Sequence, residues 1–323
     1  MLFLDKIRTL WVQIRDMYMY LFRHAMIVNG YVDDHTWRGI RHRNWGDDLN
    51  YYFIRQLTGR PVVMYHNFKL AKWLHLKNYL CIGTLLDAVE YANAQTIVWG
   101  SGVSGQERTF VPPNNILAVR GPKTKEFCDR YGIDCPEVYG DPALLLPLVY
   151  KASPPALPNR EGASKKYRLG IIPHVVDQQH PVIKEIKEKY ADEILVIDLA
   201  RYDKWTDVTD QICSCERILS SSLHGLIVSD AYRIPNCWVE LTGRISGGYF
   251  KYYDYASSVG RSFEKPIKIG NLAVVRDLMN HTDDVFSKAD NEIIKALQQG
   301  LIWVDPLQIR LGNKVNEDNK LWN

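Results

Sequence analysis

Short apolar runs and helically spaced segments alternate along most of the chain. The apolar runs are rich in Val, Ile and Leu and lack the in-and-out alternation of half-exposed strands. Such continuous runs are typical of strands covered on both faces. The candidate strands are residues 60–66, 96–102, 116–121, 167–174, 193–200, 217–221 and 237–241. Strand–helix–strand order predicts an α/β fold with parallel sheets and right-handed crossovers.

The segment 150–167 interrupts this pattern. It is rich in Pro, Ser and Gly and has no periodicity, which is typical of a linker. A chain of 323 residues is also long enough for two domains. We therefore expect two Rossmann-like parallel-sheet domains facing a cleft, at residues 1–160 and 161–323. The helices after residue 285 are expected to close the second domain and to cross back.

The N-terminal segment has the pattern of an amphipathic helix. Its apolar residues recur at alternating steps of three and four: Leu4, Ile7, Trp11, Ile14, Tyr18 and Leu21. Arg8 and Arg15 flank this stripe, and Asp5 and Asp16 lie across from it. These charges distinguish the segment from a signal peptide, and no run reaches the ~18 apolar residues of a spanning helix. Two interpretations stay open: the helix packs on its own domain, or it rests on a membrane or a partner.

Composition excludes several classes of function. A net charge of +3 is too small for a general nucleic-acid binder. The six cysteines, at 81, 128, 135, 213, 215 and 237, form no CxxC pair. We therefore expect buried free thiols in a reducing cytoplasm and no metal site. The chain has no GxxxxGK[ST] loop, and the absence of a GxSxG elbow argues against acyl transfer through serine.

The candidate catalytic and binding residues lie where predicted strands lead into helices, because ligands of open parallel sheets bind at that edge. Arg120 ends an apolar run before Gly121-Pro122, where its guanidinium would bind phosphate or carboxylate, or else pair with a local carboxylate. His224 follows the apolar run 217–221 and lies in the first turn of the helix after it. The helix dipole lowers its pKa and a bound anion raises it, which suits a general acid, although a structural role is also open.

Two further junctions carry polar residues. In "RNWGDDLNYYF", Asp47 and Asp48 fall in the first turn of a helix, where the dipole favours carboxylates whatever the function. The functional interpretation makes one of them a base or an acceptor for sugar hydroxyls, with Asn44 and Gly46 shaping the loop. His174 ends the first strand of the second half and is either a site residue or a loop residue.

Six blocks in order, "NWGDDLNYYFIRQL", "IVWGSG", "LAVRGPKTKEFCDRYGI", "VYGDPALLLP", "GIIPH" and "ILSSSLHGLIVSDAYRIP", resemble the polysaccharide pyruvyl transferase family. The resemblance runs from about residue 40 to about residue 245. It implies a GT-B-like fold and transfer of the pyruvyl group of phosphoenolpyruvate to sugar hydroxyls. The implied products are phosphate and a pyruvate ketal on a surface polysaccharide or its lipid-linked precursor, as in exopolysaccharide or capsule biosynthesis.

The resemblance also implies roles for individual residues. Arg120 matches the arginine that binds the donor, and His224 matches the histidine assigned to acid catalysis. Asp47 or Asp48 matches the Gly-Asp-Asp block. Many members carry an arginine two residues before the histidine, where this chain has Ser222. The substrate-binding residues are expected to be Arg120, Asn44, Gly46, His174, Ser222, Gly225 and Arg244, with Arg41, Arg43 and Lys123 as further sources of charge.

No cofactor is implied, and the expected partners are phosphoenolpyruvate and a lipid-linked oligosaccharide. The expected location is the cytoplasm, in contact with the inner face of the membrane. One alternative is a glycosyltransferase that uses a nucleotide-sugar donor on the same two-domain scaffold. Another is a non-catalytic carbohydrate-binding protein, suggested by the aromatic stretch at 247–258, whose rings would line an acceptor groove or belong to the core.

Overall fold

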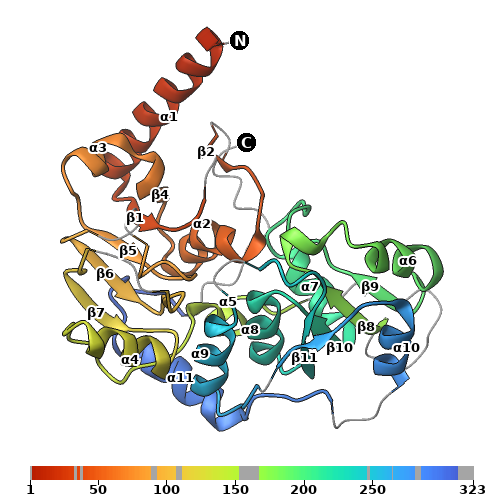
Figure 1. Cartoon of the computed structure of the whole chain (residues 1–323). Helices are drawn as coiled ribbons and strands as arrows, with labels where there is room; N and C mark the ends of the chain where they lie inside the picture. Colours follow the sequence, from red (N-terminus) through yellow and green to blue (C-terminus); the bar gives the residue numbers. More distant parts are fainter. Residues whose placement is uncertain are drawn as a thin grey trace.

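Two parallel sheets form the framework of the computed structural model (Figure 1). The structure describes residues 2–32, 35–36, 39–88, 93–106, 111–152, 167–245, 248–263, 265–280 and 285–311. In spatial order the first sheet contains β4 (Val62–Met64), β1 (Met26–Asn29), β5 (Asn78–Leu80), β6 (Thr96–Trp99) and β7 (Asn115–Ala118). The second contains β12 (Ile267–Lys268), β11 (Asn236–Glu240), β10 (Cys215–Ser220), β8 (Tyr167–Ile172) and β9 (Ile194–Val196). The neighbouring strands of each sheet pair in parallel, and the predicted α/β class is confirmed.

The two sheets share one topology. Counted along the chain within its own domain, each sheet has the strand order 2-1-3-4-5. Such a sheet reverses direction between its first and third strands, and ligands bind at that switch point. The switch points lie between β1 and β5 in the first sheet and between β8 and β10 in the second.

The helices complete both domains. They are α1 (Leu2–Arg23), α2 (Trp45–Thr58), α3 (Lys69–Trp73), α4 (Pro122–Arg130), α5 (Leu146–Val149), α6 (Pro181–Lys189), α7 (Asp207–Cys213), α8 (Leu223–Ala231), α9 (Phe250–Ser258), α10 (Leu272–Asn280) and α11 (Asn291–Trp303). Short 3₁₀ turns are η1 (Tyr65–Asn67), η2 (Pro142–Leu145) and η3 (Val175–Asp177), and β2 (His35–Thr36) pairs with β3 (Gly39–Ile40) as a small antiparallel ribbon. Pro122 begins α4 and Gly132, with φ of 66°, follows its end, as the sequence predicted.

One continuous apolar core joins the domains. It includes Leu49 and Phe53 of α2 together with Ile218 of β10 and Leu226 of α8. Near the C-terminus, α11 packs on the first domain. There the indole nitrogen of Trp99 donates to the carbonyl of Leu301 at 3.0 Å, and Gln298 donates to that of Leu144 at 2.7 Å. The predicted domain boundary at 160/161, and most of the predicted linker, lie outside the described residues.

The N-terminal segment is a helix, as predicted, but a different face of it packs on the protein. Val12, Asp16 and Met19 are buried against the first domain. In contrast, Trp11 and Leu21 of the predicted stripe each expose 53% of their surface. The helix therefore packs on its own domain, as one of the two interpretations expected, but through this other face and not through the predicted stripe. Within the described residues, no helix is both long enough and apolar enough to span a bilayer.

Candidate functional site

The first turns of α2 and α8 meet where the two domains join. Gly46 is the second residue of α2 and packs on the ring of His224, the second residue of α8. A Cβ at Gly46 would lie only 1.9 Å from the Nδ1 atom of His224. The second domain also fixes the start of α2, because the Trp45 backbone N–H donates to the carbonyl of Leu199 at 2.8 Å. Only glycine allows this close approach of helix and ring.

His224 is buried without a full set of partners. Its side chain is 8% exposed, and its Nε2 atom has no hydrogen-bond partner. Burial, together with the neighbouring Lys251, Arg120 and His174, lowers its pKa to about 3. The ring is therefore neutral at pH 7. Because buried polar atoms are nearly always hydrogen-bonded, an unpaired ring nitrogen beside three basic groups indicates a site for an anionic ligand.

Lys251 is a site residue that the sequence analysis missed. It is the second residue of α9, and burial lowers its pKa to about 8. Arg120 lowers this pKa as well, whereas Asp47 raises it. Lys251 remains mostly protonated at neutral pH and supplies a cation beside His224. The signal was present, because α9 follows β11 and so obeys the same strand-to-helix rule as α8.

Arg120 lies at the site but is enclosed. Its side chain is fully buried, and its Nε–H donates to Asp254 of α9 at 2.9 Å. Its two terminal nitrogens donate to Thr84 Oγ1 at 2.7 Å and to the Val103 carbonyl at 3.0 Å. The expectation of an open guanidinium is wrong in this respect, since a carboxylate from the other domain already pairs with it. Arg120 still contributes positive charge to the surroundings of His224.

The two neighbouring aspartates have different surroundings. Asp47 is half-buried, accepts a hydrogen bond from Asn44 Nδ2 at 2.6 Å and influences Lys251. Asp48 is buried and accepts from the Tyr202 hydroxyl at 2.6 Å. Burial raises the pKa of Asp48 to about 6. Asp47 therefore faces the cations of the site, and Asp48 joins α2 to the second domain.

His174 belongs to the same electrostatic cluster. It follows β8, on the other side of the switch point from His224, and burial lowers its pKa to about 4, with a further contribution from Lys251. Its backbone N–H donates to Ser221 Oγ at 2.9 Å, and Ser221 donates to Asp177 at 2.7 Å. The loops after β8 and β10 are thus tied together, which places both histidines at one edge of the second sheet.

Of the remaining predicted site residues, some are buried and contribute to packing, and others lie on the surface. Ser222 is buried and precedes α8, with its backbone N–H donating to Ser220 Oγ at 3.0 Å. Gly225 allows α8 to pack on β10, because a Cβ there would lie 2.3 Å from the same oxygen. Arg244 is exposed and is not among the groups that shift the pKa of His224, nor are Arg41, Arg43 and Lys123.

Comparison with known proteins identifies the family of this chain. A family model described as polysaccharide pyruvyl transferase matches residues 40–242, which contain both histidines, both aspartates and Arg120. This chain belongs to the polysaccharide pyruvyl transferase family. The resemblance seen in the sequence is thereby confirmed.

Two relatives and one solved structure are similar to this family member. The uncharacterized protein L143 of Acanthamoeba polyphaga mimivirus is 31% identical over 67% of this chain and 71% of its own length. The succinoglycan biosynthesis protein ExoV of Rhizobium meliloti is 27% identical over 69% of this chain, and the match spans 64% of ExoV. The wall teichoic acid polymerase TagF matches with a TM-score of 0.43 and 10% identity, over 97% of this chain and 94% of that one.

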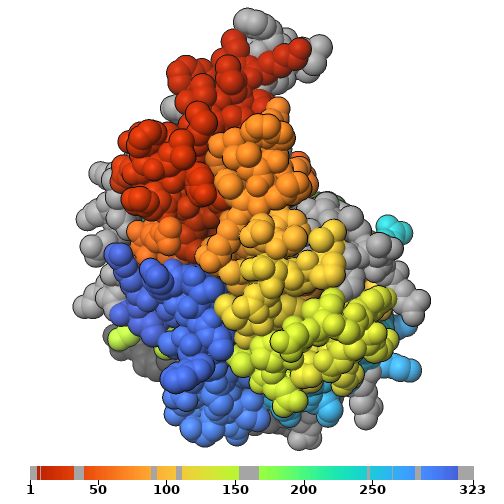
Figure 2. All heavy atoms as spheres, turned by 90° about the vertical axis from the view of Figure 1, so that its left-hand side faces the viewer, coloured from red at the N-terminus to blue at the C-terminus, as the bar shows by residue number. Residues whose placement is uncertain are grey.

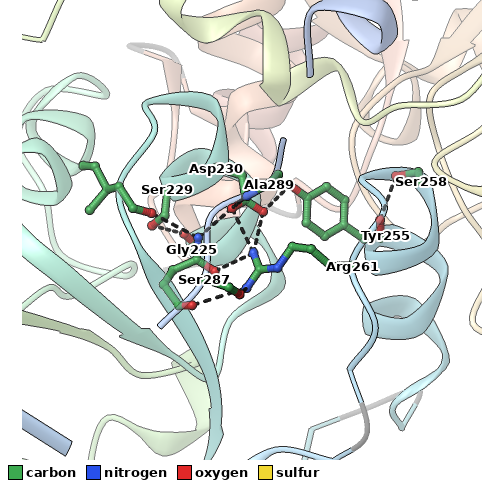
Figure 3. Close-up of polar contacts among 10 residues, drawn as sticks. Gly225, Ser229, Asp230, Tyr255, Ser258, Arg261, Ser287 and Ala289 are labelled. Atoms are coloured by element: carbon green, nitrogen blue, oxygen red, sulfur yellow. Dashed lines mark hydrogen bonds and ion pairs between the residues drawn. The ribbon is translucent and has the colours of Figure 1, made fainter. Parts of the chain in front are cut away.

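A buried polar network holds α8 and α9 together behind the site (Figure 3). Asp230, near the end of α8, accepts from the Tyr255 hydroxyl of α9 at 2.8 Å and from Arg261 at 2.8 Å. Arg261 also donates to Ser287 Oγ at 2.7 Å. Because His224 is on α8 and Lys251 is on α9, this network helps to set the spacing between these two residues.

The aromatic stretch before and within α9 contributes to the core. Tyr252 and Tyr255 are fully buried, and Tyr252 stacks on Trp238 with ring centroids 4.4 Å apart. These two rings therefore cannot line an acceptor groove. The six cysteines are buried and free, as predicted. Among the residues that the structure describes, no group of three or more His, Cys, Asp or Glu side chains is arranged to hold a metal ion.

Proposed function

We propose that the protein transfers the pyruvyl group of phosphoenolpyruvate to two hydroxyls of one sugar, forming a ketal and releasing phosphate. The observation that carries this proposal is the unpaired, buried Nε2 atom of His224 beside three basic groups. Phosphoenolpyruvate carries a phosphate and a carboxylate, so it would be held by such cations and by helix N-termini. Family membership supports the reaction class.

In the proposed reaction His224 is the general acid. The anionic donor raises the pKa of the ring, and the resulting imidazolium gives its proton to the methylene carbon. A sugar hydroxyl adds to the adjacent cationic carbon while a base, which we assign to Asp47, takes the hydroxyl proton. The bond to phosphate then breaks, and the phosphate leaves with the proton that Asp47 had taken. A second hydroxyl of the same sugar closes the ketal and gives its proton to the neutral ring of His224, which restores the imidazolium. One donor and one diol thus give one ketal and one phosphate.

Lys251 would supply the positive charge that many family members obtain from an arginine at the position of Ser222. Lys251 lowers the pKa of both histidines. Its own pKa is lowered by burial and raised by Asp47. We therefore assign Lys251 to the donor's phosphate or carboxylate. Arg120 would act at longer range, because its own N–H groups bond Asp254, Thr84 and Val103.

For the acceptor we propose a saccharide of an exopolysaccharide or of its lipid-linked repeat unit. Similarity to a succinoglycan biosynthesis protein supports this class. We propose the cytoplasm as the location, because six buried free thiols suit a reducing compartment.

The test is to incubate the full chain with phosphoenolpyruvate and a panel of galactosides and succinoglycan fragments. The proposal predicts stoichiometric phosphate release and a new ketal methyl signal by NMR. A parallel panel of nucleotide sugars tests the glycosyltransferase alternative. Sugar transfer from a nucleotide donor, without phosphate release from phosphoenolpyruvate, would overturn the proposal.

A further inference from the structure

One face of α1 exposes a continuous row of large apolar side chains. The row consists of Ile7, Leu10, Trp11, Ile14, Met17, Tyr18, Leu21 and Phe22, which expose 36–67% of their surface. These positions recur at helical spacing and therefore share one face. In Figure 1, α1 rises above the first domain, and Figure 2 shows it at the top of the molecule. We call this row the apolar face of α1.

The orientation of this face is fixed by the rest of the domain. The side chain of Gln13 donates to the Asn67 carbonyl at 2.7 Å and accepts from the Lys69 backbone N–H at 2.8 Å. Val12 and Met19 are buried on the side that packs on the domain. The helix therefore cannot turn its apolar face inward without breaking these contacts.

Basic residues outnumber acidic ones along α1 and the segments beside it, since α1 itself contains four Lys and Arg residues and two Asp residues. Residues 17–32 and 49–86, which include the end of α1 and the whole of α3, contain no Asp or Glu. They contain six basic residues: Arg23, Arg55, Arg60, Lys69, Lys72 and Lys77. Beyond α1, the neighbouring α3 exposes Trp73 at 77%. This part of the first domain combines exposed aromatic and aliphatic side chains with positive charge.

We propose that the apolar face of α1 inserts into the interfacial region of an anionic lipid bilayer. Helices that lie in this region combine an apolar face containing Trp, Phe and Leu with nearby basic residues. Tyr and Trp favour the headgroup level, because each has an apolar ring and a polar atom. The six bases complement anionic headgroups. A second copy of the chain would instead bring two predominantly basic surfaces together.

This surface acts independently of the proposed function, so its test needs no turnover. The full chain is mixed with vesicles of phosphatidylcholine alone, or of phosphatidylcholine and phosphatidylglycerol in equal parts, and bound protein is measured by flotation. We expect binding to the anionic vesicles, weakened by salt. Trp11→Ala should lower the partition coefficient about tenfold, because the indole loses its burial in lipid.

The matched control is Trp303→Ala, which removes an indole that is 89% exposed on α11, away from α1 in the chain. It should leave vesicle binding unchanged. Absence of binding to anionic vesicles, or equal loss in both variants, would overturn the proposal. So would sedimentation of the chain as a dimer that Trp11→Ala dissociates, since the apolar face would then belong to a second copy.

Discussion

Arg120 of the first domain and His224 of the second both lie where a strand leads into a helix, but their surroundings differ. Each comes from a junction between a strand and the helix that follows it, and both side chains are buried. Arg120 donates to three partners within the protein, including a carboxylate from the other domain. His224 retains a ring nitrogen without a partner. The side chain at the first junction is satisfied by the fold, whereas the one at the second keeps an unpaired nitrogen, which we propose binds the donor.

The difference shows that the position of a side chain and its hydrogen-bond partners both decide whether it is available to a ligand. A strand-to-helix junction brings a side chain to the edge where ligands bind. The neighbouring segments then decide whether that side chain is satisfied internally. Asp254 satisfies Arg120, whereas the groups around His224 are basic and oppose its protonation. An anion reverses this opposition, so ligand binding and proton uptake at His224 are linked.

Replacing His224 should have the largest effect on turnover. His224→Asn should lower the rate of phosphate release by about 10²–10⁴-fold, the usual contribution of a general acid. His180→Asn is the matched control: His180 begins α6 and its Nδ1 accepts from the Val182 backbone N–H at 3.3 Å, a capping role that asparagine also fills. Equal loss of rate in both variants would contradict the assignment.

Removing the partner of Arg120 should affect stability most. Asp254→Asn leaves the fully buried guanidinium without its counter-charge, which should cost about 3–5 kcal/mol in the free energy of unfolding. The measurement is urea denaturation. Asp129→Asn on the neighbouring α4 removes an exposed pair with Lys125 and should leave the free energy of unfolding almost unchanged. Similar losses in the free energy of unfolding in the two variants would show that the ion pair with Asp254 does not stabilise the buried Arg120.

Gly46→Ala should displace the His224 ring, because the added Cβ would lie 1.9 Å from Nδ1. A shift of about 1 Å in a reacting group lowers the rate by about 10²-fold. Gly270→Ala is the control, since nothing lies within 4 Å of a Cβ at that position. Full activity in Gly46→Ala would mean that the start of α2 does not set the position of His224.

The smallest effect concerns the pH dependence of donor binding. The pKa of Lys251 is lowered to about 8, so the ammonium is charged below that pH and neutral above it. Affinity for phosphoenolpyruvate should therefore fall about tenfold as the pH rises through 8. Lys251→Arg should abolish this fall, because a guanidinium stays charged. Calorimetric titration at several pH values measures this affinity in the wild type and in the variant. The same loss of affinity above pH 8 in Lys251→Arg would show that Lys251 does not bind the donor.

Local patterns accounted for the two parallel sheets in outline and for the junctions that carry His224 and His174, but the predicted strands did not include β1, β5 or β12. Local patterns could not reveal which side chains from distant parts of the chain pack against each junction. Asp254 is 134 residues from Arg120, so the pairing that closes this guanidinium depends on the packing of the two domains. For the same reason Asp47 and Asp48 were indistinguishable until Tyr202 was placed beside one of them. The stripe on α1 was recognised, but its helical period does not say which face meets the domain.

The most direct test of the account is to run the reaction in D₂O and examine the ketal methyl group by NMR and mass spectrometry. Proton transfer from His224, which exchanges with solvent, predicts one deuterium in each methyl group, formed together with one phosphate. In His224→Asn both signals should fall together. Phosphate release at the full rate in that variant, or a ketal methyl group without deuterium, would contradict the central claim that this imidazole donates the proton.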